Sequence, residues 1–242
     1  MNNTYYETLN ENFKKALELY TSDFSHEELI SMLKSGNIVQ KQISALRLDD
    51  IKTEDDADIL MNNLVGQDGK IREAVSFKLK EFSRQKNCHD FFLKEKNYDI
   101  FLHAIIDING NICRNIISAV SEFKIYPHFC NYFCDNLVNL TETLIDEVRK
   151  FNFKGGKYKV NKEVFKLYWC LETIYEFTEC INYDKIKKII RKTKSLQEYT
   201  IREKTAKILS NMSCDSELTL IVKELNNDVN CFVRRFITET SV

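Results

Sequence analysis

The sequence predicts an all-α fold, a right-handed solenoid of about six helical pairs, and three observations support this prediction. The chain of 242 residues contains only 6 Gly and 1 Pro, far fewer than folds rich in tight turns require. A short apolar helical pattern, a turn and a second apolar pattern recur along the chain. Related segments open the second pattern, as in "DGKIREAV" from Asp68 and "VNCFVRRFI" from Val229.

The first expected element is a capping helix in residues 1–24. Its apolar residues at helical spacing are Leu9, Phe13, Leu17 and Tyr20. A terminal helix of this kind covers the open end of a repeat array. Residues 25–139 follow with three full pairs and the first helix of a fourth. Capping boxes at Ser25 and Thr53 mark the starts of the first two pairs.

Each pair joins a shorter first helix to a second helix that starts at a recurring apolar residue. These apolar residues are Val39, Ile71, Ile112, Val160, Ile201 and Val233. The glycines precede second helices and are Gly36, Gly66, Gly69, Gly110, Gly155 and Gly156. Glycine suits a helix C-terminus because it adopts a positive φ without strain. The turn positions therefore agree with the apolar pattern.

Residues 140–159 are longer than a turn and are expected to form an insertion. Leu144, Ile145, Val148 and Phe151 predict an extra short helix there, followed by a loop at the paired glycines. Such an insertion often lies on the binding side of an array, although a connection without a role fits equally well. Residues 160–242 complete the fourth pair and add two more, so we expect a single domain over residues 1–242.

The start of the second helix resembles the HEAT repeat family in its short, armadillo-like form. The family signature is Asp or Asn in the turn, then Val-Arg, then small and aliphatic residues. The matching residues are Asp68, Ile71, Arg72, Ala74, Ile201, Arg202, Asp228, Val233 and Arg234. The first, third and fourth repeats lack the Arg at this position, although Arg114 is one residue further on. We expect the repeat Arg to bind a turn Asp, as a structural contact. The resemblance implies architecture rather than activity, because such solenoids serve many partners.

Composition narrows the class of protein. No basic segment precedes an apolar run at the N-terminus, and no stretch has the roughly 20 apolar residues of a membrane span. We therefore expect a cytoplasmic protein without a membrane partner. The 8 Cys contain no CxxC pair, and most lie at apolar helical positions, namely Cys113, Cys130, Cys134, Cys170, Cys180 and Cys231. They predict reduced core thiols, because the nearest cluster, with His128, lacks a second close pair of zinc ligands.

No cofactor, metal site or catalytic group is expected from the motifs. The pair His26-Glu27 is similar to the iron-binding pairs of HEAT-type deoxyhypusine hydroxylases, but those enzymes need several pairs and this one lies in a capping box. Charge is uneven, with roughly 6 basic and 12 acidic side chains in residues 1–60 and roughly 15 and 7 in residues 150–210. This asymmetry would steer an acidic partner to the C-terminal half. The basic run from Lys185 is either a solvated outer face or a binding patch.

These observations predict a non-catalytic protein-binding module, an adaptor, regulator or inhibitor that uses its concave surface. The candidate partner-binding residues are Lys80, Arg84, Lys162, Phe165, Lys166, Trp169 and Lys207. The lysines would attract an acidic peptide or protein, and Trp169 is either a binding anchor or a core residue. The alternative is a HEAT-like DNA glycosylase or another nucleic-acid-binding enzyme. The net charge of −1 disfavours it, since duplex-binding domains have a basic excess.

Overall fold

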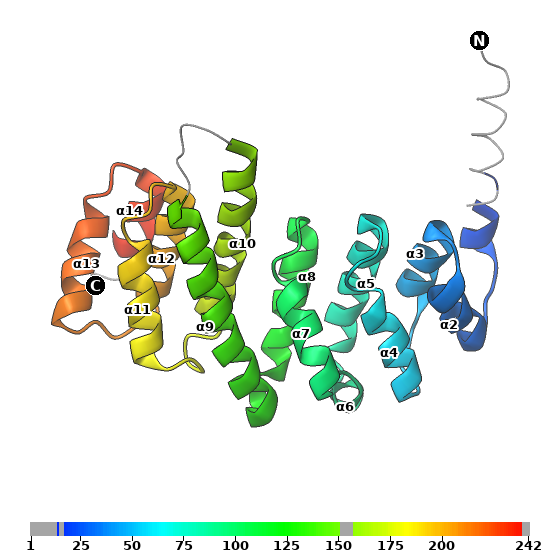
Figure 1. Cartoon of the computed structure of the whole chain (residues 1–242). Helices are drawn as coiled ribbons and strands as arrows, with labels where there is room; N and C mark the ends of the chain where they lie inside the picture. Colours follow the sequence, from blue (N-terminus) through cyan, green and yellow to red (C-terminus); the bar gives the residue numbers. More distant parts are fainter. Residues whose placement is uncertain (1–13, 15–16, 151–156, 239–242) are drawn as a thin grey trace, which may run out of the picture. The chain divides into compact units, whose positions relative to one another are not determined.

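The computed structural model of the chain describes residues 14, 17–150 and 157–238, and these residues contain no strand. Helices α2 to α14 account for most of them (Figure 1). This confirms the predicted all-α solenoid architecture. Within the same residues, no helix has the length and apolar character of a membrane span.

The helices follow the predicted order of first and second helices. The six pairs are α2 (His26–Ser35) and α3 (Ile38–Arg47), α4 (Glu54–Asn62) and α5 (Gly69–Phe82), α7 (Glu95–Ala104) and α8 (Gly110–Glu122), α9 (Pro127–Lys150) and α10 (Lys157–Glu176), α11 (Tyr183–Thr193) and α12 (Tyr199–Leu209), and α13 (Ser216–Asn226) and α14 (Cys231–Thr238). The connections add α6 (His89–Phe92) and two 3₁₀ helices, η1 (Lys86–Cys88) and η2 (Phe123–Ile125).

The chain divides into two compact units, Met1–Ile100 and Phe101–Val242, with the boundary inside α7. In the first unit α3 packs against α5, and α2 packs against α4. Asn63 links successive pairs, because its side-chain amide donates to the carbonyl of Leu33 at 3.1 Å and accepts from Lys41 Nζ at 2.9 Å. The single-domain organisation stays a prediction.

Helix starts in the first unit carry the predicted caps. Ser25 and Thr53 each accept a hydrogen bond from the third helical residue, and the side chains of Glu28 and Asp56 return it. His26 Nε2 also lies 3.0 Å from Asp56 Oδ2, so the first two pairs are joined at their starts. Burial is the strongest single effect on the pKa of Asp56 and would raise it, but hydrogen bonds from His26 and from main-chain amides hold it below its ordinary value.

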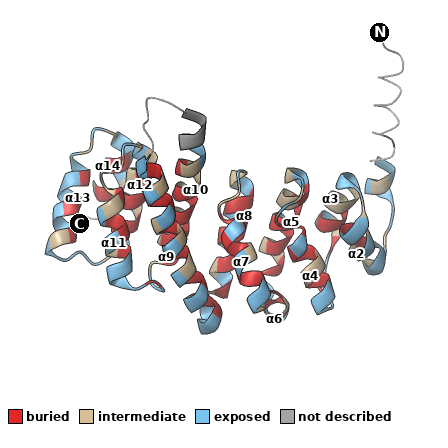
Figure 2. Cartoon of the chain, in the orientation of Figure 1, coloured by how far each residue is buried: buried red, intermediate tan, exposed pale blue. Residues whose placement is uncertain are grey.

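In the second unit the second helices α8, α10, α12 and α14 pack against one another in turn. Buried residues occupy the facing sides of these helices (Figure 2). An aromatic core joins the first helices to them, with ring centroids between 5.1 and 6.0 Å apart. Its members are Phe101, Phe123, Phe129, Phe133 and Phe177.

The predicted insertion at residues 140–159 is corrected by the structure. Helix α9 runs unbroken from Pro127 to Lys150, so residues 140–150 belong to the first helix of the fourth pair. Leu144, Ile145 and Val148 are buried. They continue the same apolar face as the earlier turns of α9, and no helix-breaking residue interrupts it. The predicted Phe151 and the loop at the paired glycines lie outside the described residues.

Other expectations also need correction. Leu17 is 51% exposed and Tyr20 is 69% exposed, so these two side chains do not make the apolar contacts expected of a cap; Leu9 and Phe13 lie outside the described residues. Gly66 has the expected positive φ of 70°, whereas Gly36 has an extended backbone. The cysteines divide, since Cys88, Cys113, Cys130, Cys134 and Cys170 are buried while Cys180, Cys214 and Cys231 are exposed.

The second helix of a pair buries more of its circumference than the single apolar stripe in its sequence. Ser76 and Ala206, which helical spacing from Ile71 and Ile201 places outside the apolar stripe, are fully buried. Ala206 lies on α12, which packs against α10, α11, α13 and α14. The hydroxyl of Ser76 donates to the carbonyl of Glu73 at 2.8 Å, which satisfies it inside the core. A helix that is enclosed on several sides has few side chains left exposed for binding a partner.

Candidate functional site

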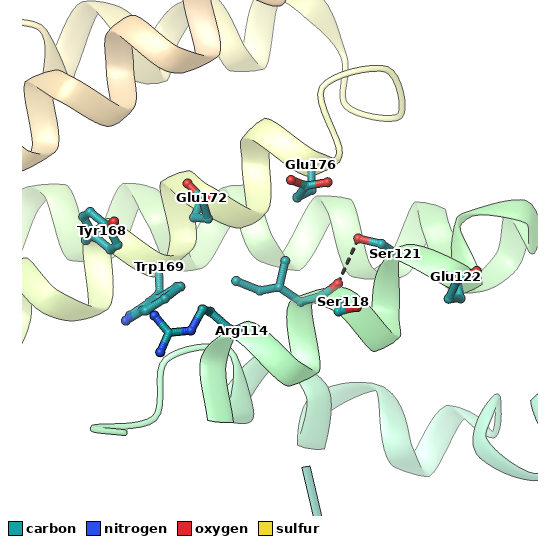
Figure 3. Close-up of a pocket in the computed structure, with 9 residues that line it drawn as sticks. Arg114, Ser118, Ser121, Glu122, Tyr168, Trp169, Glu172 and Glu176 are labelled. Atoms are coloured by element: carbon teal, nitrogen blue, oxygen red, sulfur yellow. Dashed lines mark hydrogen bonds between the residues drawn. The ribbon is translucent and has the colours of Figure 1, made fainter. Parts of the chain in front are cut away.

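A groove between α8 and α10 in the second unit is the candidate site, and we call it the α8–α10 groove (Figure 3). It has a volume of about 460 Å³. Its lining residues are Arg114, Ile117, Ser118, Ser121 and Glu122 of α8, and Tyr168, Trp169, Glu172 and Glu176 of α10. On each helix these residues recur at intervals of three or four, so each helix places one stripe on the groove.

Trp169 forms the floor at one end. It is only 6% exposed and meets Phe165 and Tyr168 in edge-to-face contacts at 6.0 and 5.3 Å. The start of α8 lies directly against the indole, because a Cβ added at Gly110 would be 3.2 Å from Trp169 Cζ2. The indole N–H has no hydrogen-bond partner among the described residues. A buried donor left in this state costs about 1–3 kcal/mol, so an acceptor supplied by a ligand would be stabilising.

Arg114 stands at the same end. Its guanidinium carbon lies 5.9 Å from the centroid of the Trp169 ring, and Nη2 donates to Asn111 Oδ1 at 2.5 Å. Figure 3 shows the guanidinium lying across the indole. The side chain is exposed, and it sits in the first turns of α8, where the helix dipole is positive. This end of the groove therefore favours negative charge.

The opposite end carries Glu122 and Glu176. Glu122 is exposed and Glu176 is half-buried, and neither carboxylate forms an ion pair with a described residue. Lys124 lies nearby, but its ammonium donates to the main-chain carbonyl of Glu176 and lies 4.8 Å from the Phe177 ring centroid. Both α8 and α10 end here, so their dipoles present negative ends. This end favours positive charge.

Glu172 lies in the middle of the α10 stripe, and two lysines of α12 neutralise its charge. Lys204 Nζ and Lys207 Nζ bind its two carboxylate oxygens at 2.6 and 2.8 Å. Burial, the strongest single effect on the pKa of Glu172, would raise it, but the two ammonium groups hold that pKa below its ordinary value. Burial alone would likewise lower the pKa of Lys204, yet Glu172 holds it above its ordinary value.

A second, mostly apolar depression of about 400 Å³ lies nearer the start of α10 and is bordered by Thr200 of α12. It is lined by Asn161, Val164, Phe165, Tyr168, Trp169 and Thr200. Trp169 and Tyr168 therefore separate two hollows, one mixed in charge and one apolar. This arrangement offers an apolar side chain a place beside the α8–α10 groove.

The predicted partner-binding residues do not form one continuous surface. Phe165 lines the apolar depression, and Trp169, which is buried, lines both that depression and the α8–α10 groove. Lys166 pairs with Glu163 at 3.0 Å and Lys207 pairs with Glu172, while Lys162 is exposed on α10. The two candidates of the first unit are also exposed or half-exposed: Lys80 is half-buried in α5, and Arg84 is exposed just after that helix.

The repeat arginines make turn contacts. Arg202 binds Asp228 of the next repeat with two hydrogen bonds of 2.6 and 3.1 Å, and Arg234 donates to the carbonyl of the same Asp228 at 2.5 Å. Arg72 donates to the carbonyl of Gln67. In the same turn, Asp68 caps α5 by accepting from the amide of Lys70 at 2.8 Å.

The basic run of α11 is paired with acids on both sides. From α9, Asp135 binds Lys185 at 2.7 Å and Glu142 binds Lys188 at 2.8 Å. On its other side, α11 pairs with acidic residues of α13 and of the N-cap of α13. The basic residues paired there are Lys187 and Arg191 of α11 and Lys194, which follows it. The run thus joins three helices.

In the parts of the chain that the structure describes, no group of three or more His, Cys, Asp and Glu side chains is placed to hold a metal ion. Cys130 Sγ and Cys134 Sγ lie 4.0 Å apart on one face of α9. His26, the other metal candidate, contacts Asp56 instead.

Comparison with known proteins concerns the fold. No family model and no curated protein matches the chain. A designed armadillo repeat protein is similar in structure, with a TM-score of 0.50 and 10% identity over 89% of this chain and 98% of its own. The chain has an armadillo-like repeat fold. An engineered protein is similar with a TM-score of 0.48 and 10% identity, over 90% of this chain and 95% of its own. At this identity the likeness describes architecture alone.

Several residues of the groove carried no signal in the sequence. Tyr168, Glu172 and Glu176 are ordinary members of an amphipathic helix until α8 is placed beside α10. Arg114 was visible only as a displaced repeat Arg. The contact between Gly110 and Trp169 joins residues 59 positions apart, which no local pattern indicates.

Proposed function

We propose that this chain is a protein-binding module that holds a segment of a partner protein in the α8–α10 groove, without catalysing a reaction. The observation that carries the proposal is the indole N–H of Trp169, a buried donor in the groove without a partner among the described residues. A main-chain carbonyl or a carboxylate of a bound segment would satisfy it. Ligand sites typically combine such placed polar groups with an apolar floor.

The armadillo-like fold supports this function, because helices stacked side by side present a continuous surface to a polypeptide. The groove supplies an apolar floor at Ile117 and Trp169, and hydroxyls at Ser118 and Ser121 along one wall. A segment lying there would contact two neighbouring repeats. Adaptor, regulator and inhibitor are all compatible with such binding.

The charge expected of the partner changes with the structure. Two of the lysines from which we inferred an acidic partner are paired, Lys166 with Glu163 and Lys207 with Glu172. They contribute little free positive charge to a peptide. For the same reason they do not favour phosphate binding. The groove lining holds Arg114 but three glutamates, Glu122, Glu172 and Glu176, so it lacks the basic excess that a DNA glycosylase needs.

The buried cysteines do not support thiol chemistry. Burial raises the pKa of Cys113 and of Cys170 to about 12. Thiols of this kind remain protonated at neutral pH and are poor nucleophiles. They serve as small apolar residues of the core.

Selection of short random peptides on phage against the full chain tests the proposal. Labelled peptides from the selected pool are then titrated by fluorescence anisotropy. Ser118→Arg fills the groove from a half-buried position, and we expect it to weaken binding about tenfold or more, or ~1.4 kcal/mol. Ser31→Arg makes the same change at an exposed position of α2 and is the matched control. Equal affinity in both variants would contradict the groove as the binding site.

A further inference from the structure

The two ends of the α8–α10 groove have opposite electrostatic character. At one end lie Arg114, the indole N–H of Trp169 and the start of α8. At the other end lie Glu122, Glu176 and the ends of both helices. Side-chain charges and helix dipoles therefore reinforce one another at each end.

Three cations near the groove, Lys124, Lys204 and Lys207, do not cancel this polarity. Lys124 is directed to a main-chain carbonyl and an aromatic ring rather than to a carboxylate of the groove. Lys204 and Lys207 are occupied by Glu172. Asn111 takes one guanidinium donor of Arg114, but a guanidinium has five donors and the side chain is exposed.

The positive end has a second feature that points to a ligand. Trp169 is buried and lines the groove, and its N–H, beside the guanidinium of Arg114, has no partner among the described residues (Figure 3). A carboxylate has several acceptor sites and can take hydrogen bonds from both groups when the exposed Arg114 shifts toward it. An amide oxygen can also accept two hydrogen bonds but carries no charge, so the charge-assisted bonds of a carboxylate with the guanidinium use this end more fully.

We propose that the partner segment is an extended strand with an acidic side chain at the Arg114 end of the groove and a basic side chain at the Glu122 and Glu176 end. The inference rests on the proposed function and adds to it the charge pattern and the orientation of the partner. Opposite charges on one segment match the two ends, whereas a uniformly acidic or basic segment opposes one of them.

The length of the groove sets the spacing of the two charges. Arg114 and Glu122 are eight positions apart on α8, which corresponds to about 12 Å along a helix. An extended chain covers about 3.3 Å per residue, so this distance is about four residues. Residues four apart in an extended chain point to the same side. The motif is therefore an acidic residue and a basic residue about four positions apart, with an apolar residue between them over Ile117.

The pool of peptides selected against the full chain tests this pattern. We expect enrichment of one order of charges, acidic before basic or the reverse, at a spacing of three to five residues. The variant Arg114→Glu/Glu122→Lys/Glu176→Lys reverses the charges of the two ends, and selection on it should enrich the opposite order. Each variant should prefer its own order about tenfold in anisotropy titrations.

A matched variant, Lys223→Glu/Asp49→Lys, exchanges two exposed charges away from the groove and should keep the wild-type order. Thermal unfolding confirms that both variants fold. Selected peptides that Ser118→Arg displaces but that lack the charge pattern would overturn this inference and leave the proposed function intact. The same follows if the exchanged variant selects the wild-type order. Peptides that bind wild type and Ser118→Arg equally would overturn both.

Discussion

The guanidinium of Arg202 joins two turns of the second unit. It donates to the carbonyls of Leu196 and Gln197 in its own turn, at 2.7 and 2.8 Å, and to both carboxylate oxygens of Asp228 in the next. Arg202 supplies donors that water would otherwise supply, at a position where the Asp228 side chain is only 8% exposed. One side chain therefore fixes the stacking of neighbouring repeats.

Arg202→Ala should lower the free energy of unfolding by about 1–3 kcal/mol, because Asp228 and two carbonyls lose a buried partner. Urea unfolding at neutral pH measures the change. Arg84→Ala, an exposed Arg just after α5, is the control and should change it by about 0.5 kcal/mol or less. Equal losses in the two variants would show that the turn contact adds nothing beyond a surface charge.

The same contact predicts a pH dependence. Hydrogen bonds from Arg202 are the main cause that lowers the pKa of Asp228 below its ordinary value. A lowered folded pKa adds stability above the unfolded pKa of about 3.9, and that stability is lost as pH falls through the folded pKa. The difference between wild type and Arg202→Ala should therefore shrink in acid. Urea unfolding of both proteins near neutral pH and below pH 4 measures it, and a difference that grows in acid would contradict the assignment.

Sequence and structure agree best where one residue has a local role. The capping residues Ser25 and Thr53 could be predicted because a cap depends on its own helix. The groove could not be predicted, since Arg114 and Trp169 meet only when α8 and α10 are packed. Ser76 is buried although helical spacing places it outside the apolar stripe, because neighbouring helices decide how much of a helix is buried.

At the scale of elements, helix α11 is held by charge on both sides. Its apolar face is buried at Ile186, Ile189 and Ile190, and its basic residues reach acids of α9 and α13. Glu217 of α13 binds Lys187 at 2.9 Å and also binds Arg191. Acidic residues of other helices thus neutralise much of the positive charge excess of residues 150–210. Composition alone does not reveal these pairs.

Glu217→Lys should lower the melting temperature, because it replaces the acid between two cations by a third cation. Hydrogen bonds from Arg191 are the main cause that lowers the pKa of Glu217 to about 2. The stability from this acid is present above pH 4.5, its ordinary value, and is lost as pH falls toward 2.

Melting curves at low and high salt test this, since exposed pairs are screened. The difference from wild type should narrow with added salt and also in acid. Glu179→Lys makes the same charge change in the exposed turn after α10 and should have a smaller effect. A difference for Glu217→Lys that is independent of salt would indicate a packing effect instead.

Helix α9 differs from the sequence prediction in a way that can be tested. If residues 140–150 were part of a tolerant insertion, a proline there would cost little. In an unbroken helix, Thr143→Pro removes a main-chain hydrogen bond and should cost about 3 kcal/mol or more. Thr143 is exposed, so Thr143→Ala is a control without loss of packing. Similar free energies of unfolding for the two variants, measured in urea, would contradict the unbroken helix and support the insertion that the sequence predicts.

At the scale of the whole molecule, the division into two units predicts how a core defect spreads. Phe133 is fully buried and packs against Phe129 and Phe177 at 5.3 and 5.1 Å. In a repeat protein each pair contacts only its neighbours, so stability is a sum of local terms rather than one shared core. Regions of such a protein open with their own free energies, which hydrogen exchange measures.

Phe133→Ala should therefore cost about 3–5 kcal/mol within the second unit, because it leaves a cavity beside the rings of Phe129 and Phe177. Hydrogen exchange followed by mass spectrometry should show the largest loss of protection in α9, α10 and α11, while α2 and α4 keep nearly wild-type rates. Leu33→Ala, a fully buried change in α2, is the reciprocal variant and should expose α2 to α4 instead. Equal loss of protection along the whole chain in either variant would mean that the units unfold together, and would support the single domain that the sequence predicts.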